Sequence, residues 1–197
     1  MIYFSSDPHF YHGNIIRMCE RPFEDLADMH TALITNWNAV VGKLDEVYIL
    51  GDLVYKGKGS QANEILRKLK GKKYLIRGNH EKYLNDKEFD SSAFEWIKDY
   101  HVLCYKDSRF VLFHYPILEW EHYHRKSVHL FGHVHSQKYR HPEEDRAINV
   151  GVDNNCFFPV SAETIYSRAF ANFNLLNSEY EKINDRQEIN NLLETEI

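Results

Sequence analysis

Two histidines separated by one valine, in the stretch LFGHVHSQ, raise the first chemical question of this sequence. His133 and His135 follow a short apolar run that breaks at Gly132. If this segment is extended, residues i and i+2 point to the same side of the chain, so both imidazoles could reach one metal ion. Either histidine alone would more often be a hydrogen-bonded surface or core residue, so the interpretation depends on the rest of the chain.

Similar polar residues end four other predicted strands. The segments SSDPHF, LGDLV, RGNHEK and FHYP supply further candidate ligands: Asp7, His9, Asp52, Asn79, His80 and His114. In open α/β sheets the site lies beyond the carboxyl ends of the strands, so we expect these side chains to converge. Asp7 and His9 have the same i, i+2 spacing and would share a face of extended backbone. Imidazole with carboxylate and amide oxygens favours Mn, Fe, Zn, Ni or Co over calcium.

The charge balance of such a site favours an anionic substrate. Two divalent ions bring about +4 against about -2 from Asp7 and Asp52, which leaves roughly +2 for an anion. The chain as a whole carries a formal charge of -5 with interspersed signs, so broad contact with a nucleic-acid backbone is not expected. The best basic cluster, RKLKGKK at 67–73, is typical of a helix C-terminus. A phosphate group held locally by metals is therefore expected, and long nucleic acid is not.

The elements that must position these residues alternate along the first half of the chain. Apolar periodicity and glycine stops predict a parallel βαβαβ start, followed by a strand-rich second half, two facing sheets and a closing helix. The predicted strands cover 1–6, 46–50, 73–77, 101–107, 109–114, 127–132 and 146–151, and the predicted helices cover 25–41, 60–70 and 160–170. The fold class is therefore α/β.

Length and composition limit the class further. With 197 residues, 43% hydrophobic and 27% charged, the chain fits one domain, expected at residues 1–175, with a polar tail or helix at 176–197. Cys19, Cys104 and Cys156 lack a CxxC pair, which favours a reducing compartment. The sequence shows neither a signal peptide nor an apolar run of membrane-spanning length, so we expect a cytoplasmic protein without membrane contact. The oligomeric state is left open.

Five fragments in order, DPH, GD, GNHE, a lone histidine before Tyr-Pro, and GHVH, resemble the calcineurin-like metallophosphoesterase family from Met1 to about Thr164. NII at 14–16, RPF at 21–23 and NVGVD at 149–153 are similar to its small stand-alone members of bacteria and bacteriophages. The resemblance implies a four-layer α/β/β/α sandwich. It also implies hydrolysis of a phosphodiester, such as a nucleotide or cyclic nucleotide, or of a phosphomonoester.

The same resemblance implies a role for each motif residue. Two ions, both expected to be manganese, would be bound. One would take Asp7, His9, Asp52 and His135, and the other would take Asp52, Asn79, His114 and His133. Asp52 would bridge the two ions, and a hydroxide bridging them would attack phosphorus in line. His80 would be the general acid. Pro8 and Tyr11 depart from the usual family pattern without removing a ligand.

Other interpretations of these residues stay open at this point. His12, Tyr11, Arg17 and His124 are candidate substrate contacts. Arg17 and Arg21 could contact a phosphate, although surface ion pairs are more common for such arginines, and His124 could lie in a solvated loop. Asp7 and Asp52 could cap helices. A different class of function, a protein-interaction scaffold without catalysis, exists in the same family, although such members usually lose ligands that are intact here.

Overall fold

The computed structural model describes residues 1–135, 141 and 146–170. Two compact units divide the chain, Met1–Ala162 and Glu163–Ile197, and the second is described only as far as Phe170. The domain boundary predicted at residue 175 and the tail predicted at 176–197 lie outside the described residues and stay predictions. None of the helices in the described part has the length and apolar character that a bilayer crossing requires.

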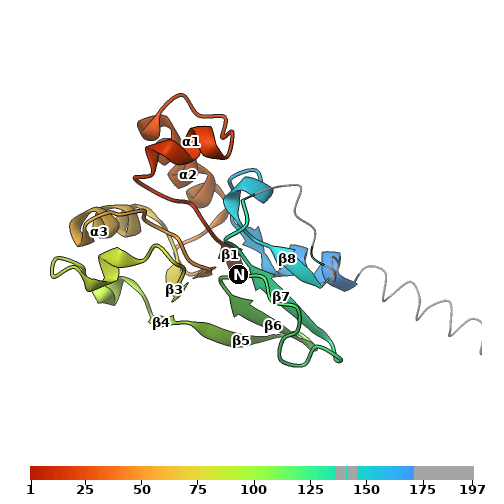
Figure 1. Ribbon diagram of the computed structural model, residues 1–197. Coiled ribbons are helices and arrows are strands. Elements are labelled where there is room, and N and C mark those ends of the chain that lie inside the picture. Colours follow the sequence, from red (N-terminus) through yellow and green to blue (C-terminus); the bar gives the residue numbers. More distant parts are fainter. Residues whose placement is uncertain (136–140, 142–145, 171–197) are drawn as a thin grey trace, which may run out of the picture. The chain divides into compact units, whose positions relative to one another are not determined.

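The first sheet is formed mainly by strands from the N-terminal half of the chain (Figure 1). Its strand order in the described part is β4-β3-β2-β1-β9. The four strands from β1 to β4 are parallel, and β9 pairs antiparallel with β1, so the sheet is mixed. The strands are β1 (Ile2–Ser5), β2 (Glu46–Ile49), β3 (Lys72–Ile76), β4 (Trp96–Lys98) and β9 (Val160–Ser161). The parallel start that the sequence predicted is confirmed.

Helices connect the parallel strands and pack on the first sheet. They are α1 (Gly13–Met18), α2 (Leu26–Val40) and α3 (Gly59–Lys68). Asp25 caps α2 by accepting a hydrogen bond from the backbone N–H of Asp28 at 2.8 Å. The buried face of α2, with Met29, Leu33 and Trp37, belongs to one apolar cluster with residues of α3 and of the sheet. The two helices predicted at 25–41 and 60–70 are therefore confirmed within one residue or two.

The second sheet has the described order β5-β6-β7-β8. β5 and β6 form an antiparallel pair, and β6, β7 and β8 run parallel. The bounds are β5 (Tyr100–Tyr105), β6 (Ser108–Phe113), β7 (Ser127–Phe131) and β8 (Ala147–Asn149). Phe4 on β1 contacts Phe110 on β6 with ring centroids 5.6 Å apart, so the two sheets face each other. All five residues of β7 are buried. The predicted α/β fold with two facing mixed sheets is confirmed.

Some elements differ from the prediction. The closing helix predicted at 160–170 begins two residues late, because Val160 and Ser161 pair with Phe4 and Tyr3 as β9. A two-residue strand has no period of its own, and only its pairing partner creates it. The short elements α1 and β4 were not predicted, nor were three 3₁₀ turns: η1 (Lys82–Asn85), η2 (Ser91–Ala93) and η3 (Val152–Asn154).

Backbone hydrogen bonds join the segments that follow the strands. Beyond β1, the N–H groups of Asp7 and His9 donate to the carbonyls of Gly51 and Asp52 at 3.0 and 3.1 Å. Ser6 forms a parallel bridge with Gly151, which follows β8 in the other sheet. The polar residues at the strand ends therefore lie on a frame that connects both sheets.

Candidate metal centre

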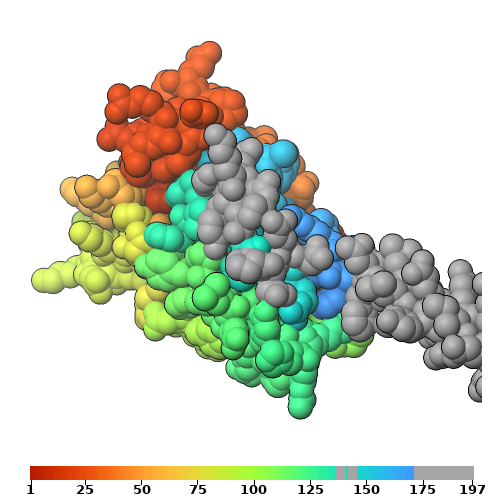
Figure 2. Space-filling view, turned by 45° about the vertical axis from the view of Figure 1, so that its right-hand side comes forward, coloured from red at the N-terminus to blue at the C-terminus, as the bar shows by residue number. Residues whose placement is uncertain are grey.

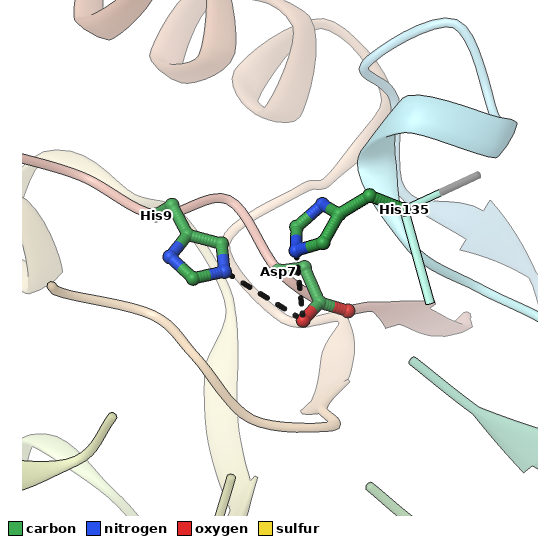
Figure 3. Close-up of side chains that lie close together, drawn as sticks. All are labelled: Asp7, His9 and His135. Atoms are coloured by element: carbon green, nitrogen blue, oxygen red, sulfur yellow. Dashed lines mark ion pairs between the residues drawn. The ribbon is translucent and has the colours of Figure 1, made fainter. Parts of the chain in front are cut away.

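The first group of candidate ligands comes from the ends of β1 and β7. One ligand atom each of Asp7, His9 and His135 lies within 4.8 Å of the others. His9 Nε2 and His135 Nε2 are 3.8 and 4.0 Å from the same atom, Asp7 Oδ1. Figure 3 shows the two rings pointing toward this oxygen from different sides. Such a cluster of imidazole and carboxylate suits a divalent transition metal.

The second group comes from the ends of β2, β3, β6 and β7. Asp52, His114 and His133 also offer one ligand atom each within 4.8 Å. Asn79 Oδ1 lies 3.0 Å from His114 Nε2 and 3.0 Å from His133 Nδ1, so the amide oxygen faces the same point. The structure thus brings together every residue that the sequence nominated for the second ion.

Asp52 lies between the two groups. Its Oδ2 atom is 3.5 Å from His9 Nε2 and 3.7 Å from His114 Nε2. Its other oxygen, Oδ1, accepts a hydrogen bond from the backbone N–H of His80 at 2.9 Å. One carboxylate oxygen is therefore held by the protein, and the other is directed at both groups.

The backbone at these positions is not extended, and the reason given for the i, i+2 spacing is wrong. Asp7, His9, Asp52 and His133 all have positive φ, between 52° and 65°. This left-handed region is unfavourable for residues with a side chain, and it persists where the surroundings enforce it. Asp7 and His9 converge because each occupies a tight turn. The turn at His133 likewise lets His133 and His135 point to different groups.

Two glycines make room for the carboxylates. A Cβ atom on Gly78 would lie 2.2 Å from Asp52 Oδ1, and one on Gly132 would lie 2.3 Å from Asp7 Oδ2. Both distances are far below van der Waals contact, so any side chain at these positions would displace a candidate ligand. These glycines have a packing role that an ordinary turn glycine lacks.

The burial of Asp7 and His9 favours a bound cation in the first group. Asp7 and His9 are each 2% exposed. Burial, with a further contribution from the charge of Asp52, raises the pKa of Asp7 to about 6. Burial and the positive charges of His135 and Arg21 hold the pKa of His9 far below its usual range, so the ring is neutral. Among the described residues, Asp7 Oδ1 and His9 Nε2 have no hydrogen-bond partner. A buried carboxylate oxygen and a buried imidazole nitrogen that both lack a hydrogen-bond partner fit a metal ion.

Hydrogen bonds behind the rings fix which nitrogen faces the centre. His114 Nδ1 lies 2.7 Å from the carbonyl oxygen of Leu50, and His135 Nδ1 lies 2.7 Å from Asp153 Oδ2. Since these oxygens only accept, the Nδ1 atoms carry the hydrogen and Nε2 is left free for a ligand. Burial lowers the pKa of His114. For His135, the bond to Asp153 and the charge of Asp7 outweigh burial and raise the pKa.

His80 lies beside the centre rather than within either group. Its side chain is 32% exposed, and its Nε2 is 3.9 Å from Asp52 Oδ2. Its ring contacts those of His9 and Tyr55, with centroids 5.5 and 4.8 Å away. The next residue, Glu81, is buried and accepts from the N–H of Leu53 at 3.2 Å. Burial and the nearby Asp52 raise the pKa of Glu81.

The four candidate substrate contacts are placed unequally. His12 is 8% exposed, lies 3.3 Å from His9 between the two Nδ1 atoms, and stacks on Tyr55 at 3.6 Å. Tyr11 donates through its hydroxyl to Glu64 at 3.1 Å. Arg17 and His124 are exposed, on α1 and in the loop between β6 and β7. Only His12 is in contact with a candidate ligand, and the substrate roles of all four stay predictions.

The sequence did not identify two residues that contact the first group. Asp153 follows β8 at its carboxyl end, as the other candidates follow their strands, so the same rule could have found it. Arg21 was expected on the surface, as an ion pair or a phosphate contact. It is 4% exposed and bound to Asp153, so its surface placement is wrong.

One alternative is excluded by the geometry, and another is less well supported. The cap residues of α1 and α3 are His12 and Lys58, so Asp7 and Asp52 are not helix caps. A third cluster of possible ligands, Cys19 with His135 and Asp153, does not fit an ion well. Asp153 is already engaged by Arg21 and His135, and burial with the nearby Asp153 raises the pKa of the Cys19 thiol to about 11.

The surface around the centre draws on both sheets. Figure 2 shows red, yellow and teal parts of the chain exposed on one face of the molecule. Asn79 and His133 are exposed, whereas Asp7, His9 and Asp52 are buried. Solvent therefore reaches the second group more easily than the first.

The fold of two mixed sheets, with candidate metal ligands at the ends of the strands, is typical of metal-dependent phosphoesterases. The family model of calcineurin-like phosphoesterases matches residues 1–137. The chain belongs to this family, which is metal-dependent.

The chain is also similar to individual proteins and to a solved structure. An uncharacterized protein of Methanocaldococcus jannaschii is 36% identical over 169 residues, which cover 83% of this chain and 88% of the relative. The Gene 66 protein of Mycobacterium phage L5 is 34% identical over 40% of this chain and 39% of its own length. A crystal structure of a protein of unknown function from Aquifex aeolicus is 31% identical, with a TM-score of 0.66, and covers 84% of this chain and 97% of that one.

Proposed function

We propose that this protein is a phosphoesterase that uses two divalent metal ions to hydrolyse a phosphodiester, such as a nucleotide or cyclic nucleotide, or a phosphomonoester. One observation supports the proposal above the others: Asp52 Oδ2 lies 3.5 and 3.7 Å from a histidine of each ligand group. A single carboxylate between two imidazole clusters would allow two ions to be held close together, as two-metal hydrolysis needs.

Each residue of the two groups then has a role. Asp7, His9, Asp52 and His135 would hold one ion, and Asp52, Asn79, His114 and His133 the other, with manganese expected and Fe, Zn, Ni or Co as further possibilities. When bound, the ions supply positive charge to the phosphoryl oxygens and lower the pKa of a water molecule near them. The surrounding protein holds the buried carboxylates in place, so little reorganisation is needed during the reaction.

His80 provides the proton for the leaving group. Its side chain is part-exposed and its backbone is tied to Asp52, so the ring stands at the entrance to the centre. Donation from an imidazole to the departing alkoxide is general acid catalysis, which matters most when the alkoxide is strongly basic.

The experiment uses an aryl phosphodiester and an aryl phosphomonoester with metal-stripped protein reloaded with manganese. We expect manganese-dependent turnover that Asp52→Asn abolishes. Asp99→Asn is the matched control, because it makes the same chemical change at a carboxylate paired on the surface with Arg77. The relative rates on the two esters would identify the preferred class.

Absence of turnover with both esters, under several metals and with folded protein, would contradict the proposal. The interaction scaffold would then be favoured, although every candidate ligand for two ions is present in this chain. A nuclease acting on long nucleic acid is less well supported. In the basic segment 67–73, the ammonium groups of Lys68, Lys70 and Lys73 bind Glu64 and backbone carbonyls, which is the behaviour of a helix end.

The cytoplasmic location remains part of the proposal. Three free cysteines support it, since thiols stay reduced in that compartment.

A further inference from the structure

A buried ion pair lies behind the first ligand group. Arg21 Nε and Nη2 donate to Asp153 Oδ1 and Oδ2, each at 2.8 Å. The side chains are 0% and 6% exposed. A bidentate pair of this kind fixes guanidinium and carboxylate in one plane, and the compensation of charge makes their burial tolerable.

The Asp153 end of the pair holds His135. Asp153 Oδ2 accepts from His135 Nδ1 at 2.7 Å, while His135 Nε2 faces Asp7 Oδ1. A carboxylate that accepts from the outer nitrogen of a histidine fixes the ring and makes its inner nitrogen a better ligand. Asp153 Oδ1 accepts from Arg21, and Oδ2 accepts from both Arg21 and His135, so Asp153 supports a candidate ligand from behind.

The Arg21 end holds the turn that carries Asp7 and His9. Arg21 Nη1 donates to the carbonyl of Pro8, and Nη2 donates to the carbonyl of Asp7, both at 2.9 Å. This turn has positive φ at Asp7 and His9, and Pro8 has no N–H with which to stabilise it. Hydrogen bonds from a charged group are stronger than neutral ones, so Arg21 is well suited to keep the turn in place.

The second group is supported differently. Behind His114 stands the neutral carbonyl of Leu50. His133 contacts Asn79, which is itself a candidate ligand. The Arg21–Asp153 pair contacts Asp7 and His135, which are two candidate ligands of the first group.

We propose that Arg21 and Asp153 are positioning residues that set the affinity of the first ligand group for its metal ion and leave the second group unchanged. The inference rests on the proposed function, because it requires an ion at each group. It assigns the two residues a role in metal binding beyond structural stabilisation.

The test measures Mn²⁺ binding to the metal-stripped full chain by titration calorimetry. Asp153→Asn is introduced into two backgrounds: His114→Ala, which leaves the first group intact, and His9→Ala, which leaves the second intact. We expect Asp153→Asn to weaken binding about ten- to hundredfold in the first background. In the second background the affinity stays the same.

Two further variants keep the result interpretable. Arg21→Lys retains the charge but not the bidentate geometry, so it should give a smaller loss in the same background, and it decides the matter if Asp153→Asn does not fold. Trp37→Phe is the matched control for general destabilisation. It removes the hydrogen bond from Trp37 Nε1 to the carbonyl of Lys70 at 3.0 Å, which lies apart from both groups, and should lower the melting temperature without changing Mn²⁺ affinity.

Spectroscopy gives a second readout without turnover. Wild-type protein with two equivalents of Mn²⁺ should show the paramagnetic resonance signal of a coupled pair, and Asp153→Asn that of an isolated ion. Equal losses in both backgrounds, or none in the first, would overturn the inference. Wild-type protein that binds no Mn²⁺ would instead overturn the proposed function, before any variant is compared.

Discussion

The two ligand groups share Asp52 but differ in enclosure and support. The first contains Asp7 and His9, each 2% exposed, and the Arg21–Asp153 ion pair stands behind it. The second includes the exposed residues Asn79 and His133, and a backbone carbonyl stands behind its buried His114. Similar ligand residues therefore form one group in the interior and a second group that is partly exposed.

The difference shows what burial does to a candidate metal ligand. A buried carboxylate that faces a neutral imidazole is costly when no cation is present, as the raised pKa of Asp7 indicates. The absence of a cation should destabilise the second group less, because water reaches part of it. We therefore expect the first group to depend on a metal for stability, and the second to be the side that substrate approaches.

The largest expected effect is on turnover after removal of one histidine from either group. His9→Ala and His114→Ala should each lower manganese-dependent turnover on the order of a thousandfold, more than loss of a supporting residue costs. Both ions are needed for the reaction, so the groups should be equal in this assay. Initial rates at saturating Mn²⁺ measure it. A loss confined to one variant would show that a single ion is enough.

The stability of the metal-free protein should distinguish the first group from the second. The folded pKa of Asp7, about 6, lies above its ordinary value of 3.8, so the cost of ionising it is absent at low pH, grows between these values and is complete above about pH 6. Asp7→Asn should therefore stabilise metal-free protein at pH 7.5 by roughly 3 kcal/mol, and by less at pH 5.

Urea unfolding in the presence of a chelator, at both pH values, measures this gain. Since Glu81 is also buried with a raised pKa, its contribution is present in both proteins and cancels in the comparison. A gain that is the same at both pH values would mean that Asp7 ionises freely in the folded protein.

The effect of replacing His80 should depend on the substrate. His80→Ala should lower turnover about a hundredfold for an alkyl phosphate ester, whose leaving group needs a proton, and far less for an activated aryl ester. Rates for a series of esters with increasing leaving-group pKa measure the dependence. Equal losses across the series would remove His80 from the role of general acid.

The smallest effect is expected at the third cluster. Cys19→Ser should leave manganese content and turnover unchanged, because Asp153 is engaged by Arg21 and His135. Metal analysis after gel filtration, with His9→Ala as the positive control, measures this. A loss of metal in the serine variant would mean that the first group extends to Cys19.

Much of the fold was predictable from local pattern. The helices near 25–41 and 60–70 have the apolar period that burial on one face requires, and the strands before Asp7, Asp52 and Asn79 are short apolar runs. The strand β9 and the short β4 were not predictable, because each consists of two or three residues and exists through its pairing partner.

By itself, the sequence determined which residue types stand at the strand ends and in what order. It could nominate the residues of both groups because the carboxyl ends of parallel strands meet at one edge. It could not give the left-handed turns that direct the side chains of Asp7, His9 and His133, nor the burial of Arg21 against Asp153, 132 positions away. Backbone strain and charge burial are stable only when distant segments enclose them, so these features were decided by the tertiary structure.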